Sequence, residues 1–287
     1  MRQRPVTRAV ILGSLTVLLA TGCGADPVVA DPVAETGDTA PGAAAGTPSG
    51  GPSPSGEAPF VPHPERLPRD PASAAPLAAA VLPGVADHGV GFVAVDRLVD
   101  GPSETDTGAH TEEDGPETHP VLTDACVWKR APIPDGVLAL RTVEAERPAD
   151  DPAADGLPGG VTVTTVVTVH DEVTAADRRM AGILEEGLRC PEQRLRADEW
   201  IAGLTSVGAL RPGDGALPAD DLITERGDFF SEEHGGPHPY LWLVARVGPV
   251  TAALAVKGTD GSTEEELTDL AQRLMRRMIT AAHTELS

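Results

Sequence analysis

Histidine and carboxylate side chains gather in two short segments that could bind a metal ion. The residues are His234, His238, Glu232 and Glu233 in one segment, and His110, His119, Glu112, Glu113 and Asp114 in the other. Imidazole and carboxylate groups bind zinc and related ions. Both segments contain Gly and Pro and lack the helical spacing that would fix the ligands. We therefore interpret both as solvated loops and expect no metal.

Catalytic groups are represented by weak candidates only. Ser206 lies in Gly-Leu-Thr-Ser-Val-Gly (203–208), which is out of register for the hydrolase motif G-x-S-x-G. His170 precedes Asp171 and Glu172, which could hold it as an acid–base group, but a surface histidine at a strand end is a simpler explanation. Phosphate-binding glycine loops, CxxC and HExxH motifs do not occur. We expect no enzyme and no cofactor, with an unrecognised hydrolase as one alternative.

The first 23 residues have the organisation of an export signal. Three arginines precede an apolar run over residues 9–20, which is too short for the roughly 20 residues that span a bilayer. Leu-Ala-Thr-Gly-Cys (19–23) resembles a bacterial lipobox, although Ala20 stands where that motif prefers leucine. We predict removal of residues 1–22 and attachment of lipid (diacylglycerol and palmitate) to Cys23 on the extracytoplasmic face. An ordinary secretory signal is the alternative.

The other two cysteines, Cys126 and Cys190, form the one pair that remains after Cys23 is lipidated. An oxidising compartment permits a disulfide between them. The chain-entropy relation gives such a bond about 4 kcal/mol of stabilisation. Two buried free thiols are the alternative.

Composition restricts the partners of the protein. The chain has 44 acidic and 22 basic residues, and loss of three signal arginines changes the charge from −22 to −25. Such a field repels nucleic acid and anionic lipid headgroups, so we expect membrane attachment through the lipid alone. Abundant Ala, Gly, Pro and Asp, with two lysines, indicate an actinobacterial genome of high GC content.

The chain divides into a tether and one folded domain. Residues 23–70 are rich in Ala, Pro, Gly and Ser and cannot bury enough apolar surface to fold, which predicts a disordered, partly extended tether. Residues 71–287 are sufficient for a single domain. Within that domain, the acidic segments 100–117 and 144–155 are expected to be surface loops.

Helices and strands are indicated by hydrophobic spacing. We predict helices over 76–82, from about Thr174 to Cys190 with Leu184 and Leu188 in its apolar stripe, and after a capping box of Thr263 and Glu266. Strands are predicted over 91–95, 125–130, 137–143, 161–169, 240–247 and 250–256. This order predicts an α+β fold: a mostly antiparallel sheet covered by helices on one face, with a long amphipathic helix at the C-terminus.

The elements resemble those of the extracellular sensor domain family of the mycobacterial kinase PknH. The resemblance lies in Leu-Pro-Gly (82–84), Ala-Cys-Val-Trp (125–128), Leu-Arg-Cys (188–190), Ala-Arg-Val-Gly (245–248) and the final helix. This chain can form one disulfide where that family usually has two. The resemblance implies a central antiparallel sheet and a non-catalytic module that senses or binds a ligand.

Half of the eight aromatic residues in the chain fall within fourteen positions and carry the only localised site prediction. They are Phe229, Phe230, Tyr240 and Trp242. Strand alternation places Tyr240 and Trp242 on the face opposite Leu241 and Leu243, where they could bind a ligand or partner or could fill a second core. We expect an envelope lipoprotein that binds a small molecule or wall component, or alternatively an adaptor for a membrane or envelope protein.

Overall fold

The computed structural model describes residues 60–95, 118–149, 159–207 and 217–287. All of them belong to one compact unit, residues 56–287. Several predicted features lie outside the described residues. They are the predicted signal peptide, the predicted lipidation site Cys23, residues 24–59 of the predicted tether, nearly all of the acidic segment 100–117, and His110, Glu112, Glu113 and Asp114. Within the described ranges, no helix has both the length and the apolar character needed to cross a bilayer.

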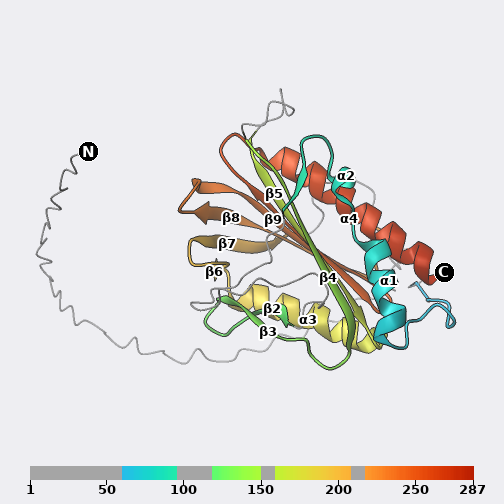
Figure 1. The fold of residues 1–287 in the computed structure, drawn as a ribbon. Helices are drawn as coiled ribbons and strands as arrows, with labels where there is room; N and C mark the ends of the chain where they lie inside the picture. Colours follow the sequence, from blue (N-terminus) through green and yellow to red (C-terminus); the bar gives the residue numbers. More distant parts are fainter. Residues whose placement is uncertain (1–59, 96–117, 150–158, 208–216) are drawn as a thin grey trace, which may run out of the picture. The chain divides into compact units, whose positions relative to one another are not determined.

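The strands confirm the predicted α+β class (Figure 1). Eight strands form one sheet in the order β1-β4-β5-β10-β9-β8-β7-β6, and each neighbouring pair is antiparallel. Their bounds are β1 Val93–Val95, β4 Val137–Arg147, β5 Val161–His170, β6 Gln193–Arg194, β7 Glu199–Val207, β8 Asp221–Ser231, β9 Gly235–Val247 and β10 Val250–Gly258. Strands β2 (Thr118–Leu122) and β3 (Trp128–Pro132) form a separate antiparallel hairpin.

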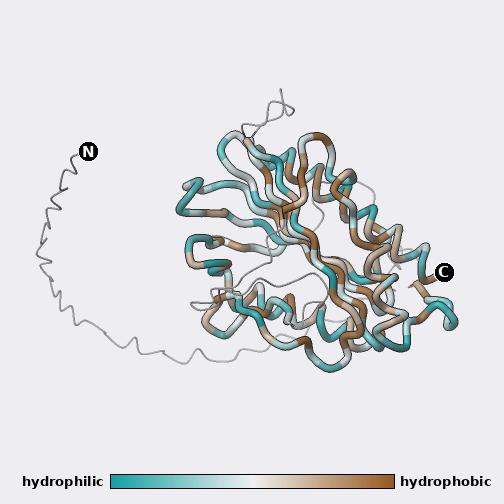
Figure 2. Tube along the Cα trace, viewed as in Figure 1, coloured by the Kyte–Doolittle hydropathy of each residue, from teal (hydrophilic) through white to brown (hydrophobic). Residues whose placement is uncertain are grey.

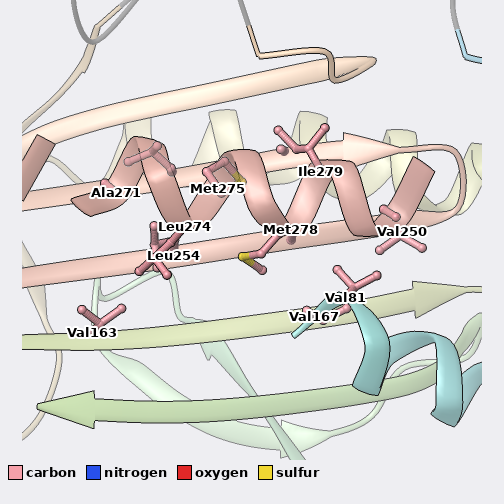
Figure 3. Packing of buried hydrophobic residues seen from close by; sticks show 14 of the residues in the cluster. Val81, Val163, Val167, Val250, Leu254, Ala271, Leu274, Met275, Met278 and Ile279 are labelled. Carbon is pink, nitrogen blue, oxygen red and sulfur yellow. The ribbon is translucent and has the colours of Figure 1, made fainter. Parts of the chain in front are cut away.

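The main core lies between one face of the sheet and three helices, α1 (Pro71–Val81), α2 (Val85–His88) and α4 (Glu264–Leu286). Alternate residues of β5, β9 and β10 point into this core, because side chains of a strand alternate between faces. The apolar stripe predicted for the last helix is buried against them, with Leu274, Met275 and Met278 at most 1% exposed. Figure 3 shows these side chains of α4 above Leu254, Val163 and Val167, and Figure 2 shows the same apolar band between helix and sheet.

The opposite face of the sheet carries helix α3 (Val173–Arg189), so helices cover both faces and not one as predicted (Figure 1). Met180 and Ile183 of α3 pack on Val244 and Ala253 of the sheet. The sheet therefore has apolar side chains on the face that points away from α4 as well, and a second helical layer is needed to bury them.

Several helix ends and faces differ from the prediction. Helix α1 begins at Pro71 after the N-cap Asp70, which places Pro76 inside the helix. The N-cap of α3 is Glu172 and not Thr174. Leu184 and Leu188, which were predicted in the buried stripe of this helix, are 41% and 73% exposed. The face of α3 that packs on the sheet is formed by Met180 and Ile183 instead.

The cap predicted for the last helix is present in part. The Thr263 side chain accepts a hydrogen bond from the Glu266 N–H, as a capping box requires. The Glu266 carboxylate, however, pairs with the buried Arg147 of β4. This pair connects the start of α4 to the end of β4, the second strand of the sheet.

Two segments that the sequence assigned to tether and loop are part of the fold. The Phe60 ring lies 4.3 Å from that of His283, and the His63 N–H donates to the Leu286 carbonyl. The described chain therefore begins beside the end of α4, about ten residues before the predicted domain boundary. Glu144, predicted in a surface loop, is buried in β4, whereas residues 150–158 lie outside the described residues.

Candidate functional site

The structure separates the four aromatic residues predicted as a recognition surface. Phe229 and Tyr240 are buried together on the α3 face of the sheet, and Trp242 on the same face is half-buried. The Phe230 ring is turned to the opposite face, where it stacks on Trp200 with the ring centroids 5.4 Å apart. Trp242 faces the opposite side from Leu241 and Leu243, as strand alternation predicts.

Strand register sets the neighbours of Trp242 on this face. Trp242 of β9 is paired with Glu225 of β8, and Glu225 is paired in turn with Ser206 of β7. Residues directly opposite in antiparallel strands point to the same side of the sheet. The Ser206 hydroxyl therefore reaches the Glu225 carboxylate, with an Oγ to Oε1 distance of 3.4 Å.

A small cavity lies over this row of residues, under the C-terminal end of α3. It is lined by Leu122, Trp128, Ile183, Glu186, Gly187, Gln193, Leu204, Glu225, Tyr240 and Trp242, which we call the α3 cavity. Its volume is about 10 Å³. A volume of that order accommodates one group the size of a water molecule.

The β2–β3 hairpin is fixed beside the α3 cavity by covalent and hydrogen bonds. A disulfide joins Cys126, just before β3, to Cys190, which caps the end of α3. The indole Nε1–H of Trp128 donates to the Gln193 Oε1 at 2.8 Å, and the Arg194 N–H donates to the Cys126 carbonyl at 2.9 Å. These contacts hold the Trp128 ring 6.3 Å from that of Trp242, centroid to centroid.

The disulfide pairing agrees with the prediction, but the position of its first cysteine does not. The sequence placed Cys126 on a strand, whereas it occupies a turn with φ of 58°. A positive φ is uncommon for a residue with a side chain. Strand β3 begins two residues later, at Trp128.

Glu225 is the acidic group at the base of the α3 cavity. It is 3% exposed, and burial raises the pKa of its carboxyl, assisted by the nearby charge of Glu186 and opposed by the Ser206 hydrogen bond. Gly187 of α3 allows this approach, because a Cβ at that position would lie 2.1 Å from the Glu225 Oε1. Burial also raises the pKa of the adjoining Tyr240 phenol.

Other charged groups on the same face are paired with one another. The Lys257 Nζ lies 2.6 Å from Glu199 Oε2 and 5.0 Å above the centre of the Phe229 ring. Arg196 is 3.3 Å from Glu144 and 3.7 Å from Glu199. Burial lowers the pKa of Lys257, and the Glu199 carboxylate opposes that effect. Two cations and two carboxylates form a balanced network, which gives these residues a structural role.

His170 is buried, contrary to the expectation of a surface histidine. It is 4% exposed, and its Nε2 lies 3.2 Å from the Thr251 Oγ1 across β5 and β10. Burial, with a smaller effect of Arg179, lowers its pKa to about 4. The ring is held by packing at the end of the sheet, away from the residues that line the α3 cavity.

The remaining chemical candidates do not converge on a site. Ser206 lies on strand β7, and its hydroxyl donates a hydrogen bond to the Glu225 carboxylate. His238 is buried with its Nε2 2.9 Å from the His234 carbonyl. Across the ranges that the structure describes, no three His, Cys, Asp or Glu side chains are grouped as metal ligands would be.

A larger hollow of about 710 Å³ follows the outer side of α4, next to Arg273 and Arg277. The hollow is open to solvent, and the described residues that line it all belong to α4. Arg277 is also paired with Asp87, at 2.8 Å. Binding sites bury most of a ligand between opposing walls, which this groove lacks in the described residues.

Sequence reasoning missed Trp128, Gly187 and Glu225 as members of the site. One available signal was the pair of cysteines, because Trp128 follows Cys126 by two residues and Gly187 precedes Cys190 by three. A disulfide between the two cysteines brings both segments to one place. Glu225 carried no such signal, since its burial depends on which strand lies beside β9.

Comparison with known proteins shows a similarity in structure and none in sequence. No known family profile and no curated protein matches the sequence of the chain. Among solved structures, the chain is similar to the extracellular domain of PknH from Mycobacterium tuberculosis, with 12% sequence identity and a TM-score of 0.41. The match covers 78% of this chain and 98% of that one. A similarity of this extent assigns neither a ligand nor an activity.

Proposed function

We propose that this chain is a non-catalytic, extracytoplasmic lipoprotein whose folded domain binds a small ligand in the α3 cavity. The observation that carries the proposal is the buried Glu225 beneath a pair of tryptophans. Buried carboxyl groups are ordinarily paired with a cation, and each one that is not paired needs an explanation. A bound ligand supplies the partner that the fold does not.

The surroundings of the cavity support a binding role over a catalytic one. A nucleophile must face the substrate, and Ser206, whose hydroxyl donates to Glu225, is not among the residues that line the cavity. The hairpin and α3 are joined by a disulfide, which gives the cavity fixed walls. Fixed walls reduce the ordering cost of binding.

The proposal is tested by two glycine variants of the same helix. Gly187→Ala places a methyl group against the Glu225 carboxylate, whereas Gly182→Ala meets no atom within 4 Å. Replacing helical Gly by Ala favours the helix by about 1 kcal/mol, which in Gly187→Ala offsets part of the cost of displacing the Glu225 side chain. Urea unfolding of both variants confirms that they are folded before binding is compared. Native mass spectrometry of the full chain, extracted from the membranes of its native cell, should show a retained small molecule in the wild type and in Gly182→Ala.

We expect Gly187→Ala to lose that molecule. A ligand that remains in Gly187→Ala would place its site elsewhere. The absence of any retained molecule from all three proteins, in extracts where the chain stays folded, would refute the proposal. Detection of the Cys23 lipid on the same intact mass tests the predicted anchor.

A further inference from the structure

The walls of the α3 cavity have an unusual balance of charge. The lining residues include two carboxylates, Glu186 and Glu225, and no basic side chain. Glu186 is satisfied by Arg179, whose Nη1 lies 2.8 Å from its Oε1. Glu225 has no basic side chain within ion-pair distance among the described residues, and its one hydrogen bond comes from Ser206. The Glu225 carboxylate is therefore the one charge in the lining that no opposite charge of the described residues balances.

The rest of the lining also suits a cation. Trp128, Tyr240 and Trp242 contribute aromatic groups. The faces of aromatic rings attract cations within about 6 Å, most strongly where water is excluded. The cavity has space for one water-sized group, and an ammonium group is of that size.

From this juxtaposition we propose that the α3 cavity binds the ammonium group of a primary amine, with the Glu225 carboxylate as its counter-ion and the tryptophan rings around it. The inference rests on the proposed ligand-binding function and names the ligand class. The remainder of the ligand extends past the half-buried residues Trp128, Glu186 and Trp242.

Other ligand classes fit the same lining less well. An anion would meet two carboxylates. A purely apolar ligand would leave the Glu225 carboxylate without a cation, at a cost in free energy. A divalent metal ion requires several fixed oxygen or nitrogen ligands, and no such group occurs within the described part of the chain. A neutral hydrogen-bonding ligand would leave the charge of an ionised Glu225 unbalanced or would bind its protonated form, and a titration with methanol distinguishes this class.

The three tryptophans of the chain provide a direct assay. The full chain, labelled with 5-fluorotryptophan, should give three fluorine NMR signals, which single Trp→Phe variants assign. Methylammonium chloride is the probe, with potassium chloride at equal ionic strength as the reference. We expect saturable shifts of the Trp128 and Trp242 signals. Trp200 lies on the opposite face of the sheet and should not respond.

The Glu225→Gln variant identifies the counter-ion. The amide has the shape of a protonated carboxyl and no negative charge. Because hydrogen bonds between charged groups are stronger than those with a neutral partner, methylammonium binding should weaken at least tenfold. Burial raises the pKa of Glu225 in the folded state, so the ionised carboxylate destabilises the fold at neutral pH. Glu225→Gln should therefore unfold at no lower urea concentration than the wild type, which separates lost binding from lost folding.

Gly187→Ala and Gly182→Ala serve as a second pair if the Glu225 variant fails to fold. Methylammonium binding should be lost in the first and retained in the second. A parallel titration compares n-butylammonium, a free alkylamine, with Nα-acetyl-lysine amide, which represents a lysine within a peptide. Binding of either compound supports the ammonium class.

Three results would overturn the inference. These are no saturable shift with methylammonium, unchanged affinity in Glu225→Gln, or equal shifts with methanol that persist in that variant. If methylammonium fails but a retained molecule sensitive to Gly187→Ala is found by mass spectrometry, the ligand class is wrong and the proposed binding function stands. If both fail, the proposed function fails too.

Discussion

Replacement of His170 by glutamine should remove part of the acid sensitivity of the fold. His170 is 4% exposed at the end of β5, and burial lowers its pKa to about 4. The usual value in an unfolded chain is about 6.5. Arg179 disfavours the charged ring as well, and Asp171 opposes both effects. The folded protein therefore holds His170 neutral at pH values where the unfolded chain already binds a proton.

The sign and size of the effect follow from these two pKa values. As the pH falls below about 6.5, the unfolded state takes up the proton first, so stability is lost progressively until the pH reaches about 4. Linkage gives a loss of about 2 to 3 kcal/mol between pH 7 and pH 4 from this one group. The steepest part is about 1.2 kcal/mol per pH unit, near pH 5 to 6.

Urea unfolding at half-unit pH steps measures the effect. The free energy of unfolding of the wild type should fall more steeply between pH 6.5 and pH 4 than that of His170→Gln, by the amount given above. His234→Gln is the matched control for replacing a histidine, because the His234 side chain is 47% exposed and its replacement should change the free energy of unfolding by less than about 0.5 kcal/mol. Parallel profiles for His170→Gln and wild type would refute a buried neutral histidine.

Three further predictions test the fold. Replacing Cys126 and Cys190 by serine should lower the free energy of unfolding by about 4 kcal/mol, because the disulfide closes a loop with a sequence separation of 64 residues and so restricts the unfolded chain. Urea denaturation of the double variant and of the oxidised wild type measures the difference. Thr263→Ala should cost about 1 kcal/mol through loss of the N-cap of α4, and a thermal midpoint equal to that of wild type would argue against the cap. Leu274→Ala should cost about 2 to 5 kcal/mol, whereas Leu188→Ala, at a residue that is 73% exposed, should change stability by less than about 0.5 kcal/mol. A similar cost for the two leucines would contradict the burial described for α3 and α4.

The elements of the main core could be predicted because a single periodicity governs each of them. Val161, Val163, Val167 and Val169 alternate along β5 and are all buried. The stripe of α4 likewise has one apolar face, which packs against the sheet. In such elements the sequence pattern and the burial pattern coincide.

Strands β7 and β8 were not predicted because their apolar residues do not repeat regularly. β7 includes Gly203 with φ of 65°, and the pairing with β8 shifts between Ala202 and Thr205. An extra residue in one strand moves later side chains to the other face, so the alternation breaks. β8 carries Glu225 on a buried face, where the sequence suggests an exposed residue.

The α3 cavity was predictable in one part only. Strand alternation gave the side on which Trp242 lies. The identity of its neighbours depends on strand order and on the disulfide that brings β3 to the end of α3. These are contacts between distant segments, and local spacing does not encode them.

The two lysines of the chain differ in their access to chemical reagents. Lys257 is 9% exposed and bound to Glu199, whereas Lys129 is exposed on β3, next to Trp128. An amine-reactive dye applied to the folded protein should therefore attach to side chains at Lys129 alone, and both lysines should react after unfolding. The fold thus provides one accessible lysine, on the hairpin beside the α3 cavity, from which a fluorophore can follow events at the cavity mouth without any engineered residue.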